Sequence, residues 1–231
     1  DLRQTEVTNL DIRFEKFMKR GELVSVSGFY KNFTNPIEIV VFKPETPTNF
    51  TPRNAVSAIV YGAEFELKKG LNVVGLDHFS VATNVSYIMS AVQMTPQEIA
   101  GKTNELRTGQ LIGATREMQG QAPYIINVGV NYEKKDQGVN ANLSYNVQGP
   151  KLAIVGIGRL PDVYTESFHS LNFKASYAFQ SNDKAQISIA VDNILADDNL
   201  QVYRGYQARD QIFTQLEPQR TFKVGFSYQI K

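Results

Sequence analysis

The sequence has no cysteine, only two histidines and no long apolar run. The lack of cysteine excludes disulfides, thiolate metal sites and cysteine nucleophiles. No run of about 18 apolar residues occurs, so no stretch has the length and composition of a transmembrane helix. The 24 basic and 23 acidic residues nearly cancel, and a formal charge of +1 gives no electrostatic case for a nucleic-acid partner.

Arrangements typical of catalysis are also scarce. No G-x-S-x-G motif occurs, and the two histidines, His78 and His169, lie far apart in the sequence. Glu64 and Glu66 are two residues apart, a spacing that strand alternation produces without any catalytic purpose. Three aspartates at 192, 197 and 198 are interpreted as a solvated loop rather than a calcium site. We therefore expect no enzyme activity, no metal site and no cofactor.

The stretch 121–148 shows the most regular pattern in the chain. Successive side chains of a strand point to opposite sides, so each half of this stretch has one apolar face and one polar face. The polar face is rich in asparagine, glutamine and serine. The pattern predicts a hairpin with lipid on one side and a wet lumen on the other. The apolar face comprises Tyr124, Ile126, Val128, Val130 and Tyr132 and, after a polar turn at 134–138, Val139, Ala141, Leu143, Tyr145 and Val147.

The same alternation recurs along the whole chain and predicts an all-β fold, an antiparallel transmembrane β-barrel. A mean hydropathy of −0.28 does not contradict this, because only every second residue of such a strand faces lipid. Outward tyrosines at 132, 177 and 228 fit an aromatic girdle at headgroup level. We predict nine strands, at 7–19, 23–35 (with 37–42 extending it), 56–69, 77–91, 124–133, 139–148, 167–179, 185–195 and 221–230.

The connections between these strands alternate between short and long. The long ones are 43–54, 92–120, 149–166 and 196–219, although 151–158 is apolar enough to extend the preceding strand. A Thr-Pro-Gln-Glu sequence at Thr95 predicts a short helix at 96–106. Outer-membrane barrels have short periplasmic turns and long extracellular loops. Single-chain bacterial barrels also have even strand numbers, so nine strands without a signal segment before Asp1 predict a part of a larger barrel.

Five segments resemble the late barrel strands of TonB-dependent outer-membrane receptors. Their order and spacing match the C-terminal part of that barrel along nearly the whole chain. One departure is the end at Lys231, where many barrels have a terminal aromatic residue. The segments are 8–38 (TNLDIRFEKFMKRGELVSVSGFYKNFTNPIE), 60–69 (VYGAEFELKK), 116–132 (REMQGQAPYIINVGVNY), 192–195 (DNIL) and 221–231 (TFKVGFSYQIK).

This resemblance implies that residues 1–231 are about nine C-terminal strands of a barrel of about 22 strands. The plug domain and the early strands then lie outside this sequence. The implied function is TonB-coupled uptake of a scarce nutrient, such as an iron chelate, a vitamin or an oligosaccharide, across the Gram-negative outer membrane. The implied partners are outer-membrane lipid, the TonB complex, the plug domain and remaining strands, and a surface lipoprotein as a further candidate.

Two groups of residues are candidate ligand contacts. Asparagines of the polar face either solvate the lumen and the plug or contact a ligand directly, for example through sugar hydroxyls. Residues of the last long loop are the second group, because loops on rigid scaffolds often carry binding. The candidates are Asn127, Asn131, Asn142 and Asn146 on the polar face, and Tyr203, Arg204, Tyr206 and Arg209 in the loop.

Two other classes of protein remain open at this point. A passive, porin-like or structural barrel without TonB coupling has the same strand pattern. A soluble β-sandwich binding module also alternates, but it would bury the apolar face beneath a second layer. Burial of Ile126, Val128, Leu143 and Val224 under another part of the chain would favour the sandwich.

Overall fold

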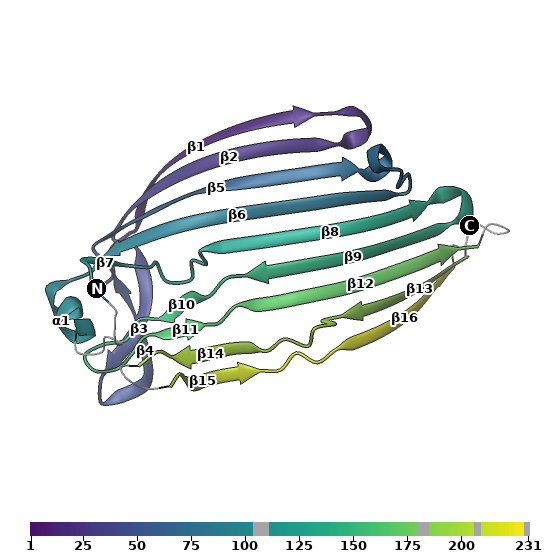
Figure 1. Ribbon diagram of the computed structural model, residues 1–231. Helices are drawn as coiled ribbons and strands as arrows, with labels where there is room; N and C mark the ends of the chain where they lie inside the picture. Colours follow the sequence, from purple (N-terminus) through teal and green to yellow (C-terminus); the bar gives the residue numbers. More distant parts are fainter. Residues whose placement is uncertain (104–110, 180–184, 206–208, 229–231) are drawn as a thin grey trace.

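The structure is a computed structural model that describes residues 1–103, 111–179, 185–205 and 209–228. Its main element is one broad antiparallel sheet in which strands adjacent along the path β1-β2-β5-β6-β8-β9-β12-β13-β16 are paired (Figure 1). All nine predicted strands are confirmed, with ends that differ by a few residues. They are β1 (Glu6–Phe17), β2 (Leu23–Thr34), β5 (Ser57–Gly70), β6 (Phe79–Gln93), β8 (Tyr124–Lys134), β9 (Val139–Gln148), β12 (Phe168–Ala178), β13 (Ala185–Asp192) and β16 (Thr221–Tyr228).

The register of this sheet aligns apolar residues with apolar residues and polar with polar. Directly paired residues point to the same face, so a row across the sheet shows the character of that face. One row of paired positions runs Phe14, Val26, Phe65, Val85, Ile126 and Val147. A row on the opposite face runs Glu15, Ser25, Glu66, Asn84, Asn127 and Asn146. The two predicted faces are therefore confirmed.

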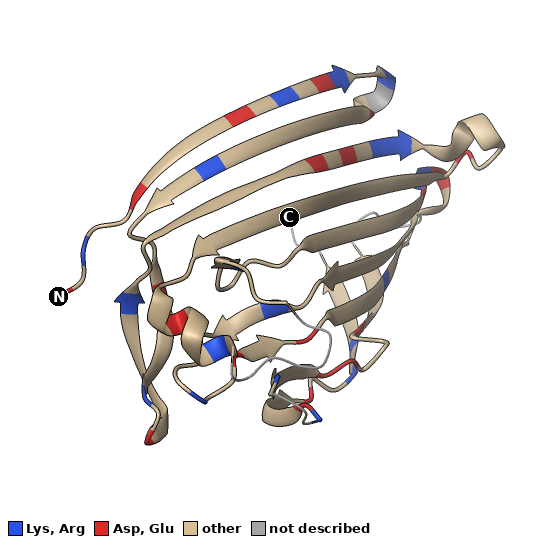
Figure 2. Cartoon of the chain, turned by 60° about the vertical axis from the view of Figure 1, so that its left-hand side comes forward, with Lys and Arg blue, Asp and Glu red and all other residues tan. Residues whose placement is uncertain are grey.

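The polar face changes character across the sheet. Charged side chains alternate along β1 and β5, whereas β6 and β9 contain none (Figure 2). Arg13 of β1 donates to Glu66 of β5 at 2.9 Å, across the intervening β2. Along β9 the polar face presents amides and hydroxyls, and charges return with Lys174 of β12 and the Asp192–Lys223 pair between β13 and β16. The polar face thus has an ionic part near β1 and a neutral, hydrogen-bonding part near β9.

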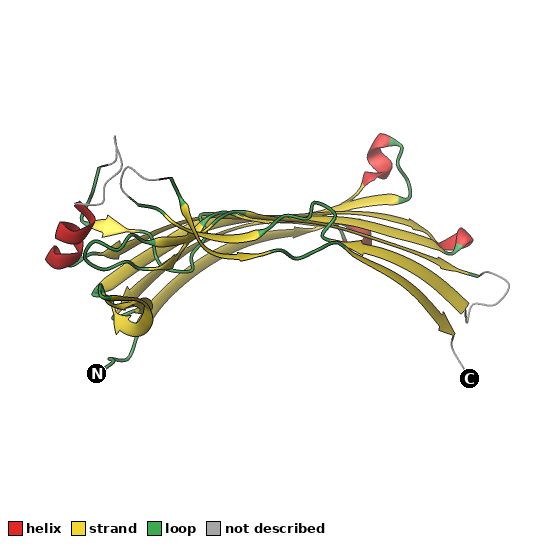
Figure 3. Cartoon of the chain, turned by 90° about the horizontal axis from the view of Figure 1, so that it is seen from below, coloured by secondary structure: helices red, strands yellow, loops and turns green. Residues whose placement is uncertain are grey.

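The apolar face is not covered by a second layer within the described part of the chain. Val26, Phe65 and Leu143 lie on inner strands and are still 51%, 38% and 42% exposed. The sheet is bowed, and β1 and β16 form its two edges, so it does not close on itself (Figure 3). Uncovered apolar side chains on inner strands contradict the β-sandwich alternative. None of the described helices has the length and apolarity needed to cross a membrane.

A four-stranded sheet continues the wall beyond four of the long strands. Its order, β10-β11-β14-β15, follows the order β9-β12-β13-β16, because each of its strands adjoins one of those in the chain (Figure 1). The segments 149–166 and 196–219 were expected to be loops, with 151–158 a candidate extension of the preceding strand. β10 confirms part of that extension. The expected loops are wrong at β11, β14 and β15, where neighbouring backbones form ladder hydrogen bonds with one another. The strands are β10 (Lys151–Ile154), β11 (Val163–Thr165), β14 (Asn199–Tyr203) and β15 (Gln211–Leu216).

A separate two-stranded sheet comprises β3 (Ile37–Lys43) and β4 (Thr46–Asn54). The predicted extension of β2 through 37–42 is wrong, because Asn35 has a left-handed φ of 53° and Pro36 follows it. The predicted loop at 43–54 is also wrong, since most of it is β4. Its Pro52 faces Ile39 in a ladder with only two strands, where a missing amide donor is tolerated.

The predicted helix is confirmed as α1 (Pro96–Thr103), and its predicted end at 104–106 lies outside the described residues. The Thr95 hydroxyl accepts the Glu98 amide at 3.2 Å, as expected of an N-cap. A two-residue strand, β7 (Thr115–Arg116), pairs with the end of β6. At the other end of the sheet, the short turns contain the 3-10 helices η1 (Lys19–Gly21), η2 (Leu71–Val74) and η3 (Lys135–Gln137).

The DNIL sequence marks the point where β13 passes toward β14. Asn193 has a φ of 53°, which asparagine tolerates better than most residues. Its amide donates to the Asn172 side chain at 2.9 Å, and the Ile194 amide donates to the Leu171 carbonyl at 2.8 Å. The motif therefore ends the ladder of the large sheet and anchors the bend to β12.

Candidate ligand-binding site

The long connections all lie at one end of the large sheet, here named the loop end, and the β3–β4 hairpin reaches across this end. The Val41 amide donates to the Val155 carbonyl at 3.2 Å, and the Val155 amide donates to the Ile39 carbonyl at 3.3 Å. Val155 directly follows β10, so the hairpin joins parts of the sheet that are separated by three strands. The contact is sealed by a buried cluster of Val40, Leu152 and Val155, against which Tyr164 packs.

The far side of the same hairpin meets the last long connection. The Phe50 ring of β4 lies edge-on to the Phe213 ring of β15, with 6.1 Å between the ring centroids. Phe213 in turn meets Tyr203 of β14 at 5.2 Å, also edge-on. Aromatic rings favour this geometry. The hairpin is thus held at both β10 and β15, and it bridges the loop end rather than extending freely from it.

Gln119 connects the β6–β8 segment to both β3 and β10. Its side-chain amide donates to the carbonyls of Ile39 and Ala153 at 2.7 and 2.8 Å, and its oxygen accepts the Ile39 amide at 2.6 Å. The neighbouring Gly120 amide donates to the Leu152 carbonyl at 2.8 Å. The Gln119 side chain therefore reinforces the short backbone contact between β3 and the β10 segment.

The segment around Gln119 lies on the polar face of the large sheet. Met118 packs against the buried cluster of Ala55, Ala58 and Val92. Ala58 and Val92 are paired and share the face of Glu64 and Ser86. The Met118 amide also donates to the Ser90 hydroxyl at 2.9 Å. The β6–β8 connection consequently folds inward over the polar face and narrows its loop end.

Four charged side chains form a closed network beneath the hairpin. Arg116 donates to both Glu38 and Glu98 at 2.5 Å, and Arg53 donates to Glu38 at 2.9 Å and to Glu98 at 3.5 Å. The side chains of Glu38, Glu98 and Arg116 are only 5%, 7% and 8% exposed. Burial lowers the pKa of Arg116, but the two carboxylates outweigh it and raise that pKa. The network joins β3, β4, α1 and β7.

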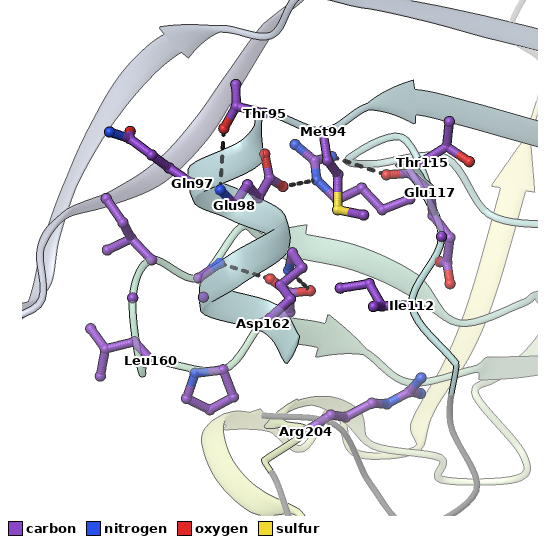
Figure 4. Close-up of a pocket in the computed structure, with 18 of the residues that line it drawn as sticks. Met94, Thr95, Gln97, Glu98, Ile112, Thr115, Glu117, Leu160, Asp162 and Arg204 are labelled. Carbon is purple, nitrogen blue, oxygen red and sulfur yellow. Dashed lines mark hydrogen bonds and ion pairs between the residues drawn. The ribbon is translucent and has the colours of Figure 1, made fainter. Parts of the chain in front are cut away.

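A cavity of about 550 Å³ opens beside this network (Figure 4). Its wall comes from α1, the segment 111–117, the segment 156–162 and the strand ends at Tyr164 and Arg204. Asp162 accepts the Gly156 amide at 2.8 Å and pairs with Lys102 of α1. These bonds fix the 156–162 segment against the helix, so this wall of the cavity has a defined position.

Tyr164 and Arg204 form the opposite side of the cavity. The guanidinium carbon of Arg204 lies 4.1 Å from the Tyr164 ring centroid, and its Nη2 donates to Glu166 at 2.9 Å. Burial, together with the charges of Asp162 and Glu117, raises the pKa of the Tyr164 phenol. The cavity therefore presents a protonated phenol, a stacked guanidinium and carboxylates, a set that suits a polar ligand with hydrogen-bonding groups.

The four predicted asparagines lie where expected, on the polar face, but away from this cavity. Asn142 donates to Asn131 at 2.6 Å, and Asn146 donates to Asn127 at 2.5 Å, so they form two amide pairs between β8 and β9. Asn127 and Asn146 also line a shallow hollow with Asn84 and Asn172. Contact of these amides with a ligand remains a prediction.

The predicted loop residues separate into different places. Arg204 lines the cavity, whereas Tyr203 packs on Phe213. Arg209 is exposed, and Tyr206 lies outside the described residues. Sequence reasoning missed Glu38, Glu98, Arg116 and Tyr164. A glutamate between Ile37 and Ile39 was the only hint of a buried charge, and nothing in the sequence indicated its partner 78 positions away.

No group of three or more histidine, aspartate or glutamate side chains suited to a metal ion occurs in the ranges that the structure describes.

An open, two-faced antiparallel sheet with short turns at one end and long connections at the other defines the wall of a transmembrane-type β-barrel. The family model of the TonB-dependent receptor-like β-barrel matches residues 1–194, most of the 231 positions. The chain belongs to this family. The match includes the segments 8–38, 60–69 and 116–132 and the first three residues of DNIL, and it ends before the last strand.

Solved structures share this fold at low sequence identity. The ferric-catecholate import receptor Fiu of E. coli K12 superposes with a TM-score of 0.62 at 12% identity, over 98% of this chain and 28% of its own. The FrpB iron transporter of Neisseria meningitidis gives 0.60 at 14%, over 98% and 31%. The copper transporter OprC gives 0.62 at 14%, over 100% and 32%. No curated protein matches the sequence.

This chain therefore spans about a third of the length of these structural neighbours. It covers enough of their barrel to show a common fold.

Proposed function

We propose that this chain is the C-terminal part of an outer-membrane receptor that takes up a scarce nutrient with energy supplied through TonB. The observation that carries the proposal is the two-faced sheet of a TonB-dependent receptor family member, with an uncovered apolar face. An apolar face of this kind fits the hydrocarbon of the Gram-negative outer membrane, and a polar face fits a water-filled lumen. The loop end is then extracellular and the turn end periplasmic.

The two open edges support the assignment to a larger barrel. The outer backbone groups of β1 and β16 have no strand partner among the described residues. Unpaired backbone groups in hydrocarbon are very costly, so strands from outside residues 1–231 complete the barrel. A plug domain packs against the polar face, and TonB binds a segment outside this chain. These partners are part of the proposal, as is a surface lipoprotein at the loop end.

The cavity beside Arg204 and Tyr164 contributes to the extracellular ligand site, together with the amides of β8 and β9. The structural neighbours are a ferric-catecholate import receptor, an iron transporter and a copper transporter, so a metal chelate is the first cargo to test. The buried ion network and the β3–β4 hairpin narrow the loop end, which favours a gated receptor over a passive channel. A receptor family and transporter neighbours also agree with the expectation that the protein is not an enzyme.

Uptake by cells that produce the complete receptor tests the proposal. Fractionation and heat-dependent gel mobility establish first that the receptor is a folded outer-membrane barrel. Cells are then given radiolabelled ferric catecholate or copper, with and without a protonophore. We expect receptor-dependent uptake that the protonophore abolishes. Uptake that persists without proton-motive force identifies a passive channel, and a receptor that stays soluble refutes the membrane assignment.

A further inference from the structure

One of the short turns is apolar where the others are polar. Residues 71–76 read Leu-Asn-Val-Val-Gly-Leu, whereas the turns at η1 and η3 read Lys-Arg-Gly and Lys-Asp-Gln. Val73, Val74 and Leu76 are 71%, 68% and 46% exposed. Contact with water is unfavourable for exposed aliphatic side chains at the tip of a turn. Their exposure points to an apolar or interfacial partner outside the chain.

The backbone holds this turn in a defined shape. The Leu76 amide donates to the Leu71 carbonyl at 3.1 Å, and Gly75 closes the 3-10 helix with a left-handed φ of 81°. At its base, the Glu22 carboxylate accepts the Gly70 amide at 3.0 Å and the Lys69 ammonium at 2.6 Å. Because the turn is anchored to the neighbouring hairpin, its apolar side chains project in a fixed direction.

That direction is toward the apolar face. η2 stands off the bowed sheet on the side opposite to the β3–β4 hairpin (Figure 3). The hairpin is bonded to the Gln119 segment, which lies on the polar face. The turn therefore leans away from the lumen, out of reach of a plug domain on the polar face.

The turn is also continuous with the aromatic residues of the apolar face. The Phe79 amide donates to the Leu76 carbonyl at 3.0 Å, and the Phe79 ring lies 4.9 Å from the Tyr132 ring. Aromatic residues at this end of a barrel lie at the level of the lipid headgroups. Val73 and Val74 thus extend the apolar face by one more turn of backbone.

We infer that the 71–76 turn is an interfacial anchor, which inserts Val73, Val74 and Leu76 into the headgroup–acyl boundary of the periplasmic leaflet of the outer membrane. Its partner is the phospholipid surface itself. The inference rests on the proposed function, since that assigns the turn end to the periplasm. In this orientation lipid contacts Phe79 and Tyr132, so a periplasmic protein would have to displace lipid to reach these side chains.

Site-specific labelling tests this, because the chain has no cysteine of its own. Val73→Cys, Gln137→Cys and Val128→Cys are made in the complete receptor, with any cysteine outside this chain replaced. Each variant is labelled with an environment-sensitive fluorophore and reconstituted in phosphatidylcholine vesicles. Gln137 is exposed in the polar η3 turn, and Val128 lies in the middle of the lipid-facing row, so they are the aqueous and the membrane references.

We expect the fluorophore at position 73 to emit at shorter wavelength than that at 137. Brominated phosphatidylcholine should quench the fluorophore at 73 about twofold more strongly than the fluorophore at 137. Aqueous iodide should quench the fluorophore at 137 more strongly than the fluorophore at 73. If position 128 is quenched by the brominated lipid but 73 behaves like 137, the anchor is refuted and the receptor assignment stands. If position 128 is not quenched either, the membrane assignment fails, and the anchor fails with it.

Discussion

Arg116 of β7 and Glu38 of β3 are bonded at 2.5 Å, 78 positions apart in the chain, with side chains only 8% and 5% exposed. Glu98 and Arg53 complete the network, so two acids balance two bases. A buried ion pair need not add net stability, since desolvation opposes its attraction. It does fix one arrangement, because any other leaves a charge buried alone. The network therefore determines where the β3–β4 hairpin docks.

Replacing Arg116 with alanine should release the hairpin. Two carboxylates would then be buried with one partially exposed arginine, and loss of a buried partner costs about 3–5 kcal/mol. Hydrogen exchange of the β3 and β4 amides in the purified receptor measures the effect. Lys135→Ala is the matched control, because this lysine is 84% exposed and forms only a 3.7 Å pair with Glu133. Unchanged exchange of β3 in Arg116→Ala would show that the network does not hold the hairpin.

Gln119 should matter more than its neighbour Gln121. Gln119→Ala removes three hydrogen bonds to Ile39 and Ala153, an effect of about 2–3 kcal/mol at about 1 kcal/mol each. The Gln121 side chain donates only to the adjacent Ala122 carbonyl, so Gln121→Ala should have little effect. Protease cleavage in the hairpin of intact cells reports the difference. Equal cleavage of both variants would contradict the bridging role of Gln119.

The two faces of the sheet should respond differently to a charge. Val128→Arg places a cation in the lipid-facing row and should destabilise the barrel by about 2–4 kcal/mol near the midplane. Asn142→Arg places the same group in the polar lumen and should be milder. Denaturant-dependent folding into vesicles measures both. Equal losses would count against the separation of the faces.

Tyr164 should make stability depend on alkaline pH. Its raised pKa means that the folded protein disfavours the phenolate, mainly through burial and then through Asp162 and Glu117. The contribution is complete below the ordinary tyrosine pKa of about 10 and is lost as pH rises through the folded pKa. Tyr164→Phe should therefore lose less thermal stability than wild type between about pH 9 and pH 11. An identical pH dependence of the two unfolding midpoints would refute this.

The sequence predicted the large sheet well and the loop end poorly. The alternation from Tyr124 to Val147 was enough to assign β8, β9 and their faces. A shift of register by one residue would turn every apolar side chain to the polar side, so the pattern fixes the register. For β10, β11, β14 and β15 the segments are short and mixed in composition. They pair because they extend neighbouring strands of the large sheet, which bring them side by side. Proline in 43–54 indicated a loop, although a two-stranded hairpin accommodates it.

The candidate site shows the same division. The asparagines on the polar face were predictable, since alternation alone places Asn127 and Asn142 there. The cavity was not, because Arg204 was chosen for its loop composition, while Tyr164 and Asp162 gave no comparable indication. The TonB-dependent family resemblance came from short motifs, and the DNIL turn has a physical basis in the left-handed Asn193.

The sequence by itself determined a sheet with a lipid face and a water face, the order of its strands and the alternation of short and long connections. Strand alternation is a local property, because successive side chains of a strand point to opposite sides. Each segment therefore shows by its own residues which side faces lipid and which faces water. Only the tertiary structure decided that the β3–β4 hairpin folds inward, that Glu38 meets Arg116 and that a cavity forms beside them. Those contacts join residues far apart in the chain, and they depend on how the curved wall brings its connections together.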